Sequence, residues 1–137
     1  MGLQQAKSAN SPPVVDEKRS SFILLVDDDA DVLVTMQEVL EDDGYEVVAV
    51  RSGVDALLEL KREPLPKLII LDLQMPRMSG QSFMAEVARH PEWAQIPVLV
   101  VSGDPNGLEK VRKMGASGYL RKPITLSELF SMVASFS

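Results

Sequence analysis

Carboxylates gather at one point near the start of the chain, in the segment FILLVDDDADVLVTMQE that spans residues 22–38. Four of the five positions from residue 27 to residue 31 are aspartate, and they directly follow an apolar run. Clustered carboxylates repel one another, so such a set at the end of a buried run needs a positive partner. Three interpretations are open at this point: a calcium-binding loop, a phosphate-handling metal site, or a solvated acidic turn.

Three further residues with chemically useful side chains follow short apolar runs later in the chain. Asp72 follows LIIL, Ser102 follows VLVV, and Lys122 lies within GYLRKP. Carboxylate oxygens suit a hard divalent cation such as Mg²⁺. A metal, an ammonium and a hydroxyl together can bind the oxygens of a phosphoryl group, and an aspartate can accept phosphorus as a nucleophile. These residue types favour phosphoryl chemistry if the fold brings them together.

The elements that would position these residues alternate between two hydrophobic patterns, which predicts a (βα)₅ α/β domain. Short runs rich in Val, Ile and Leu suit strands that are covered on both faces. We expect such strands at residues 22–26, 46–50, 68–71, 97–101 and 118–120. The alternation favours a doubly wound parallel sheet with right-handed crossovers. Ligands of such sheets bind beyond the carboxyl ends of the strands, where the polar residues above would converge.

Amphipathic stripes predict a helix after each strand. The expected stripe residues are, in chain order, Val32, Met36, Val39 and Leu40, then Val54, Leu57 and Leu58, then Phe83, Met84 and Val87, and finally Leu126, Leu129, Phe130 and Val133. Gly44 and Pro64 would end the first two helices. A short fourth helix is expected to have Asp104 as its cap, Pro105 at its first position and Gly115 at its end. Thr125 and Glu128 form a capping box for the last helix.

The whole chain has the composition of one ordinary globular domain of 137 residues. Residues 1–20 are polar and aperiodic, which predicts a flexible tail ahead of a domain over residues 21–137. The net charge of −6 disfavours a nucleic-acid surface, and the absence of cysteine excludes disulfides and thiolate metal sites. The apolar runs are too short to cross a membrane, and the N-terminus lacks a signal peptide. We therefore expect a cytoplasmic protein.

Four segments, FILLVDDDADV, LIILDLQMPRMSG, PVLVVSG and GASGYLRKPI, closely resemble the receiver domains of two-component response regulators of the chemotaxis-regulator type. The resemblance covers residues 21–136, and the four motifs agree with the family in order and approximate spacing. It implies a receiver domain over residues 21–137 with a flavodoxin-like strand order of 2-1-3-4-5.

The resemblance implies a metal-assisted phosphoacceptor site. Asp72 would be the phosphoacceptor. Asp27 and Asp28 would be the acidic pair, with Asp28 the more direct ligand of Mg²⁺. The backbone carbonyl of Gln74 would be a further ligand, beside Asp72 itself.

The resemblance also assigns the residues around the phosphoryl group. Ser102 and Lys122 would contact its oxygens, Ser102 and Tyr119 would act as switch residues, and the bond from Lys122 to Pro123 would be cis. Gly103 is a departure, because the family often has Ala there.

Two more departures flank the site. Asp104 stands two positions beyond Ser102, and Gln74 stands two positions beyond Asp72. Both would lie at the mouth of the site and could tune dephosphorylation. The segment 102–115 is also shorter than in chemotaxis-type receivers, which would alter the surface around the fourth helix.

The function implied by the resemblance is a phosphoryl-accepting signalling switch. A sensor histidine kinase or a histidine phosphotransfer protein would donate to Asp72. Phosphorylation would change the conformation of a surface formed by the fourth helix, fifth strand and fifth helix, and this surface would control an unknown downstream protein. Such a chain is not a conventional enzyme, although it would catalyse its own phosphorylation and slow autodephosphorylation.

Three alternatives compete with the switch. One is a receiver-like interaction module that works without phosphorylation. Another is a haloacid-dehalogenase-type phosphatase whose D-x-D motif would be Asp27 and Asp29, although no acidic pair follows Lys122. The calcium loop would take Asp27 as its first position and Glu38 as its twelfth, but Val32 stands where the sharp turn needs glycine. We expect Asp29 and Asp31, the other two aspartates, to start a helix.

Overall fold

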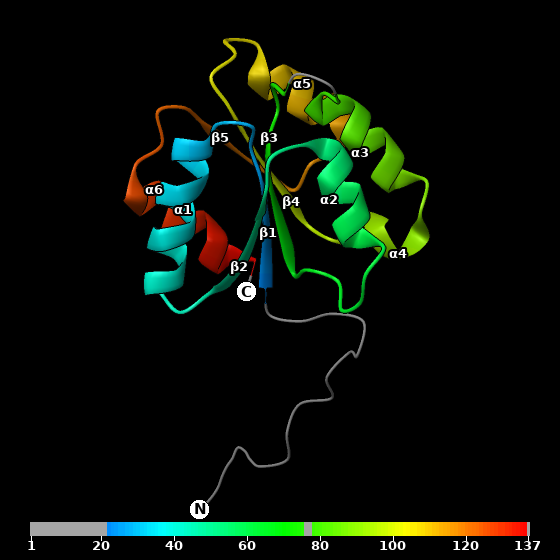
Figure 1. The fold of residues 1–137 in the computed structure, drawn as a ribbon. Coiled ribbons are helices and arrows are strands. Elements are labelled where there is room, and N and C mark those ends of the chain that lie inside the picture. Colours follow the sequence, from blue (N-terminus) through cyan, green and yellow to red (C-terminus); the bar gives the residue numbers. More distant parts are fainter. Residues whose placement is uncertain (1–21, 76–77, 137) are drawn as a thin grey trace, which may run out of the picture.

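The computed structural model describes residues 22–75 and 78–136, which alternate between strands and helices as predicted. Figure 1 follows the chain through these elements. The strands are β1 (Phe22–Val26), β2 (Glu46–Val50), β3 (Leu68–Asp72), β4 (Val98–Ser102) and β5 (Gly118–Arg121). The helices are α1 (Ala30–Asp42), α2 (Gly53–Leu60), α3 (Gly80–Ala88), α4 (Pro91–Ala94), α5 (Gly107–Met114) and α6 (Leu126–Ser135). The predicted tail over residues 1–20 lies outside the described residues.

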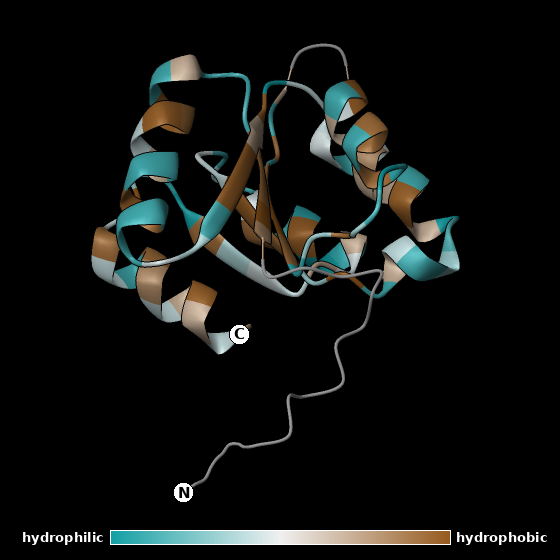
Figure 2. Cartoon of the chain, turned by 60° about the horizontal axis from the view of Figure 1, so that its bottom comes forward, coloured by the Kyte–Doolittle hydropathy of each residue, from teal (hydrophilic) through white to brown (hydrophobic). Residues whose placement is uncertain are grey.

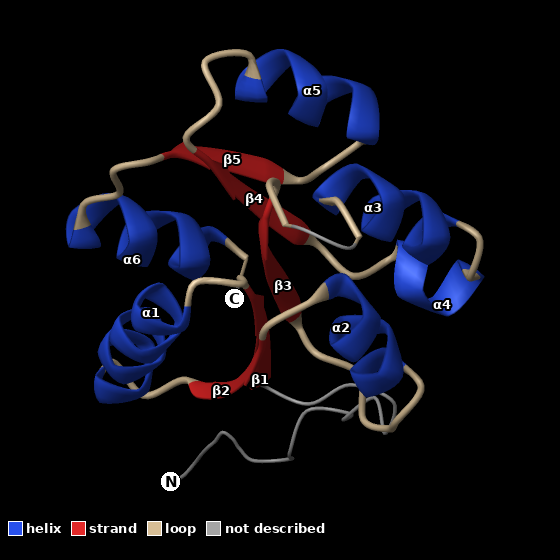
Figure 3. Cartoon of the chain, turned by 45° about the horizontal axis from the view of Figure 1, so that its top comes forward, coloured by secondary structure: helices blue, strands red, loops and turns tan. Residues whose placement is uncertain are grey.

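The strands form one parallel sheet in the order β2-β1-β3-β4-β5, which confirms the flavodoxin-like topology. Every residue of β1, β3 and β4 is buried, because helices cover both faces of the sheet. Figure 3 shows α1 and α6 on one face and α2, α3 and α5 on the other. The carboxyl ends of all five strands therefore meet at a single edge.

Each face of the sheet has its own apolar core, built from alternate strand residues. Leu24, Ile69 and Phe83 belong to one core, while Leu25 and Ile70 belong to the other. The strands are hydrophobic along most of their length, whereas the helices also carry hydrophilic residues (Figure 2). None of the helices in the described part of the chain is long and apolar enough to cross a membrane.

The buried face of α2 differs from the prediction. Val54 and Leu58 are 46% and 55% exposed, whereas Ala56 and Leu60 are buried. Gly53 starts this helix against the side chain of Met78, and a Cβ at residue 53 would lie 2.9 Å from the sulfur of that methionine. The helix thus packs through Gly53, Ala56 and Leu60, which leaves the side chains of Val54 and Leu58 in solvent.

Smaller shifts affect the stripes of α1 and α6. In α1 the buried residue of the first turn is Leu33, while the predicted Val32 is only partly buried. In α6 Leu129 and Val133 are buried as predicted, but Leu126 is 53% exposed. The first residue of a helix has a free side toward solvent, so an apolar residue there need not face the core.

The start of α5 was predicted wrongly. This helix begins at Gly107 with Asn106 as its N-cap, and the cap makes no side-chain hydrogen bond. Asp104 instead forms a turn before the helix, in which its carbonyl oxygen accepts from the N–H of Gly107 at 2.9 Å. Its carboxylate accepts from the N–H of Asn106 at 2.8 Å. Gly115 ends the helix with a φ of 72°, as predicted.

Two local features complete the fold. The capping box of α6 is confirmed, since Thr125 accepts from the N–H of Glu128 and the Glu128 carboxylate accepts from the N–H of Thr125. The helix α4 was not predicted. It buries Trp93, against which the ring of His90 stacks with 3.9 Å between centroids.

Gly80 fixes the path from β3 into α3, and this contact yields a prediction. A Cβ at residue 80 would lie 2.9 Å from the Cα of Leu73 and 3.1 Å from the carbonyl oxygen of Asp72. We expect Gly80→Ala to lower the free energy of unfolding by about 1–3 kcal/mol, because backbone atoms cannot move aside cheaply. Urea denaturation measures this change.

Gly103→Ala is the matched control for this substitution. A Cβ at residue 103 has the Cβ of Lys122 as its nearest neighbour, at 3.8 Å, which is an ordinary contact. Equal stability of the two variants would contradict the steric argument.

Candidate functional site

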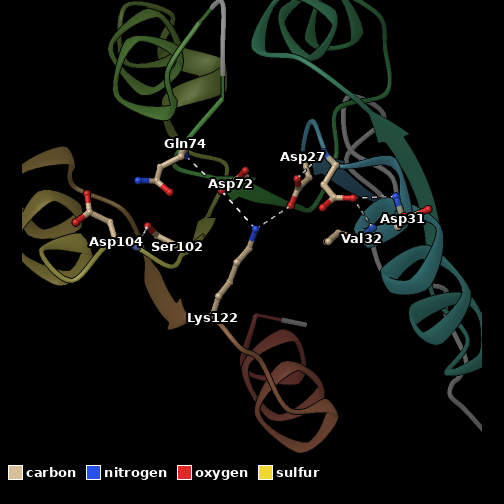
Figure 4. Close-up of polar contacts among 9 residues, drawn as sticks. Asp27, Asp31, Val32, Asp72, Gln74, Ser102, Asp104 and Lys122 are labelled. Atoms are coloured by element: carbon tan, nitrogen blue, oxygen red, sulfur yellow. Dashed lines mark hydrogen bonds and ion pairs between the residues drawn. The ribbon is translucent and has the colours of Figure 1, made fainter.

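The predicted site residues lie at the carboxyl edge of the sheet (Figure 4). Asp27 follows the last residue of β1, and Asp72 and Ser102 are the last residues of β3 and β4. Lys122 follows the last residue of β5. Each of these residues lies at the end of a strand of the parallel sheet, so the register of the strands sets the spacing between the side chains.

Three carboxylates form the centre of the site. Oxygen atoms of Asp27, Asp28 and Asp72 all lie within 4.8 Å of one another. Asp27 and Asp72 are buried, and Asp28 is partly buried at the rim. An Asp27 oxygen also accepts a hydrogen bond from the N–H of Asp29 at 2.9 Å, which holds the turn that follows β1.

Lys122 reaches into this cluster from the far end of the sequence. Its Nζ lies 3.4 Å from Asp27 Oδ2 and 3.7 Å from Asp72 Oδ1. Figure 4 shows the ammonium between the two carboxylates. The peptide bond from Lys122 to Pro123 is cis, as predicted. The ammonium of Lys122 thus forms ion pairs with two buried carboxylates.

The charge balance at Asp72 is unfavourable for an ionised carboxylate. Burial raises the pKa of Asp72 to about 6, and the negative charge of Asp27 acts in the same direction. Lys122 and the N–H of Gln74, which donates to Asp72 Oδ1 at 3.3 Å, pull the pKa down but do not cancel the increase. The site therefore has an excess of negative charge.

This donor set fits a hard divalent cation. Such ions prefer oxygen ligands, and several carboxylates at short range supply them. A bound cation would also offset the burial and the carboxylate repulsion that raise the pKa of Asp72. The roles of the individual residues in phosphoryl transfer stay predictions.

The Ser102 hydroxyl is buried at the end of β4. Its oxygen accepts a hydrogen bond from the N–H of Asp104 at 3.0 Å. No hydrogen bond donated by this hydroxyl is present among residues 22–75 and 78–136.

Tyr119 is partly buried and packs against the start of α5. A Cβ at residue 107 would lie 2.7 Å from its hydroxyl oxygen, so Gly107 provides the space for the ring. The predicted switch tyrosine is thus coupled to α5 by a steric contact.

The calcium loop is not formed. Asp29 is the N-cap of α1, and its carboxylate accepts from the N–H groups of Asp31 and Val32 at 3.0 and 3.3 Å. The loop would need residues 27–38 to wrap around an ion, but α1 already begins at Ala30. Glu38 lies on the exposed side of that helix. The expectation that Asp29 and Asp31 start a helix is confirmed.

Two contacts at the rim were not foreseen. Arg51 donates from Nη2 to the carbonyl oxygen of Asp28 at 3.3 Å, which ties the β2–α2 connection to the acidic turn. Lys110 on α5 forms an ion pair with Asp104. Arg51 lies outside the four motifs. Lys110 lies on α5, whereas Asp104 lies in the loop before that helix, so no local sequence pattern indicates either contact. A cleft of about 370 Å³ opens beside Asp28 and Arg51.

Comparison with known proteins places these features in context. The family model for the response regulator receiver domain matches residues 23–134. The polar-differentiation response regulator DivK of Brucella ovis is 31% identical over 119 residues, which cover 83% of this chain and 94% of DivK.

Solved structures of response regulators have a similar fold. The chemotaxis response regulator CheY4 of Vibrio cholerae has a TM-score of 0.78 at 27% identity, covering 85% of this chain and 98% of CheY4. The Mn²⁺-bound form of the response regulator Rcp1 has a TM-score of 0.70 at 30% identity, covering 85% of this chain and 91% of Rcp1.

The raised pKa of Asp72 predicts how stability depends on pH when a chelator is present. The folded chain holds this proton more tightly than the unfolded chain, whose pKa stays near 3.8. Asp72 therefore destabilises the fold above about pH 6, and the penalty fades as the pH falls toward 4. We expect Asp72→Asn to raise the free energy of unfolding by up to about 3 kcal/mol at about pH 8.

Thermal and urea unfolding with chelator and with Mg²⁺ measure this effect. Mg²⁺ should stabilise the wild-type chain more than the Asp72→Asn variant. Asp31→Asn is the matched control, because Asp31 is exposed and lies outside the carboxylate cluster. An Asp72→Asn variant that is less stable than wild type at high pH with chelator would refute the charge argument.

Proposed function

Because the chain belongs to the response regulator receiver family, we propose that it is a signalling switch in which Asp72 accepts a phosphoryl group. The main support is that one edge of the sheet holds a buried carboxylate, an ammonium and a buried hydroxyl. The donor would be a sensor histidine kinase or a histidine phosphotransfer protein. The proposal includes a cytoplasmic location and an unidentified downstream protein as the target.

The proposed metal is Mg²⁺, held by Asp27, Asp28, Asp72 and the backbone carbonyl of Gln74. The carboxylate cluster and the raised pKa of Asp72 support this assignment. Rcp1, to which the chain is similar, was solved in an Mn²⁺-bound form. When bound, the ion would neutralise carboxylate charge and bind a phosphoryl oxygen.

The reaction would be a direct transfer. An Asp72 oxygen forms a bond to phosphorus while the bond from phosphorus to the donor imidazole nitrogen breaks, and the electron pair leaves with that nitrogen. The Lys122 ammonium and the Ser102 hydroxyl would hold the phosphoryl oxygens in the transition state. Attack of water on phosphorus would later release phosphate and restore the carboxylate.

The output would come from the loop after β4. A phosphoryl group on Asp72 would attract the Ser102 hydroxyl, and residues 103–106 connect Ser102 to the start of α5. Tyr119 packs on that start, so a shift of the loop would change its surroundings. The surface formed by α5, β5 and α6 would then bind the downstream protein differently.

The competing functions find less support. A haloacid-dehalogenase-type phosphatase would use Asp29 as the second acid of its motif, but this carboxylate caps α1 and lies outside the cluster. An interaction module that works without phosphorylation has no need for a complete set of Asp72, Ser102 and Lys122. We therefore retain the phosphoryl-accepting switch.

Labelling with acetyl phosphate and Mg²⁺ tests the proposal directly. We expect intact mass spectrometry to show one added phosphoryl group on wild type and none on Asp72→Asn. Lys122→Ala should slow labelling by about 10²-fold, since it removes a charge that stabilises the transition state. Label retained at another residue in Asp72→Asn would refute the assignment of Asp72.

The switch role of Tyr119 can be tested separately with fluorotyrosine and fluorine NMR. The chain has two tyrosines, and Tyr45 lies apart from the site, with its ring under the ammonium of Lys67. Beryllofluoride with Mg²⁺, a phosphoryl mimic, should shift the Tyr119 signal and leave that of Tyr45 in place. Gly107→Ala should shift the Tyr119 signal even without the mimic, because the added methyl group occupies the position of the ring. A Tyr119 signal that does not respond to the mimic would contradict the switch role.

A further inference from the structure

Asp104 holds the loop between β4 and α5 through four contacts. Its N–H donates to Ser102 Oγ at 3.0 Å, and its carbonyl oxygen accepts from the N–H of Gly107 at 2.9 Å. One carboxylate oxygen accepts from the N–H of Asn106 at 2.8 Å, and the other pairs with the ammonium of Lys110. This residue therefore links the candidate site to the first turn of α5.

Of these four contacts, only the ion pair with Lys110 joins two side chains, and Lys110 belongs to α5. The side chain of Asp104 is only 11% exposed, while that of Lys110 is 41% exposed. The hydrogen bond from Lys110 holds the pKa of Asp104 below its ordinary value. Lys110 thus holds the Asp104 carboxylate by a side chain that comes from α5.

The orientation of the Ser102 hydroxyl follows from the same loop. Because its oxygen already accepts from the N–H of Asp104, its proton must point in another direction. Ser102 ends β4 beside the end of β3, where Asp72 lies. A loop held in place would keep that proton available to an oxygen bound near Asp72.

We propose that the Asp104–Lys110 ion pair positions the Ser102 hydroxyl for phosphoryl transfer. The inference rests on the proposed function and makes Asp104 and Lys110 positioning residues. Asp104 and Lys110 act through Ser102, and neither needs to touch the phosphoryl group.

Lys110→Gln is the central test, since Lys110 is partly exposed and pairs with Asp104, which is not a member of the carboxylate cluster. We expect the rate of labelling by acetyl phosphate with Mg²⁺ to fall by about three-fold, the size of effect expected for one ion pair near the surface. Lys110→Arg should restore the rate. Lys113→Gln is the matched control, because Lys113 lies on the same helix and, within the part of the chain that the structure describes, pairs only with the exposed Glu109. It changes the net charge equally but should leave the rate unchanged.

The same substitution in a Ser102→Ala background separates positioning from a direct charge effect. Without a hydroxyl to position, Lys110→Gln should cause no further loss of rate. A loss as large as in the wild-type background would overturn the proposal, because the unpaired Asp104 carboxylate would then act on the donor itself. A wild-type rate in Lys110→Gln would overturn it as well.

Hydrogen exchange on the unphosphorylated chain keeps this test independent of the proposed function. The N–H of Asp104 should exchange faster in Lys110→Gln than in wild type or Lys113→Gln, because the hydrogen bond to Ser102 would open more often. Unchanged exchange would refute the proposal even if Asp72 is labelled normally. A wild-type chain that takes no label but shows the faster exchange in Lys110→Gln would refute the proposed function and leave the loop contact supported.

Discussion

The repulsion between buried carboxylates at one edge of the sheet is the constraint on which the structure of the site depends. Asp27 and Asp72 are held close by strands that cannot separate, since β1 and β3 are neighbours buried on both faces. Burial strengthens their repulsion because it removes water that would screen the charges. A cation or a proton that reduces the negative charge is therefore favoured at this edge.

The rigid and the adjustable parts of the site come from different elements. The acidic residues stand on short turns that are held by backbone contacts, such as the approach of Gly80 to Leu73. The hydroxyl of Ser102 is connected to α5 through a loop that Asp104 holds by backbone and side-chain contacts, and Tyr119 packs directly on the start of α5. Backbone packing resists displacement more strongly than one ion pair, so a change of charge at Asp72 is expected to move the loop and leave the carboxylates in place.

The sequence was sufficient for the alternation of elements and for the residues at the strand ends, because both follow from short local patterns. The strand order needed the resemblance to a family. The buried face of α2 could not be predicted, because Gly53 and Ala56 bring the helix close by being small, and a search for apolar side chains favours Val54 and Leu58 instead. The pairing of Asp104 with Lys110 depends on a turn whose shape no periodicity describes.

The position of Lys122 has a consequence for the order in which the site can form. Its ammonium meets Asp27 across 95 residues of sequence, and it does so only after β5 has joined the edge of the sheet. As the chain leaves the ribosome, the first four strands can emerge before this positive charge exists, so the acidic cluster would lack its internal partner. Completion of the site is therefore a late event, tied to the docking of the last strand.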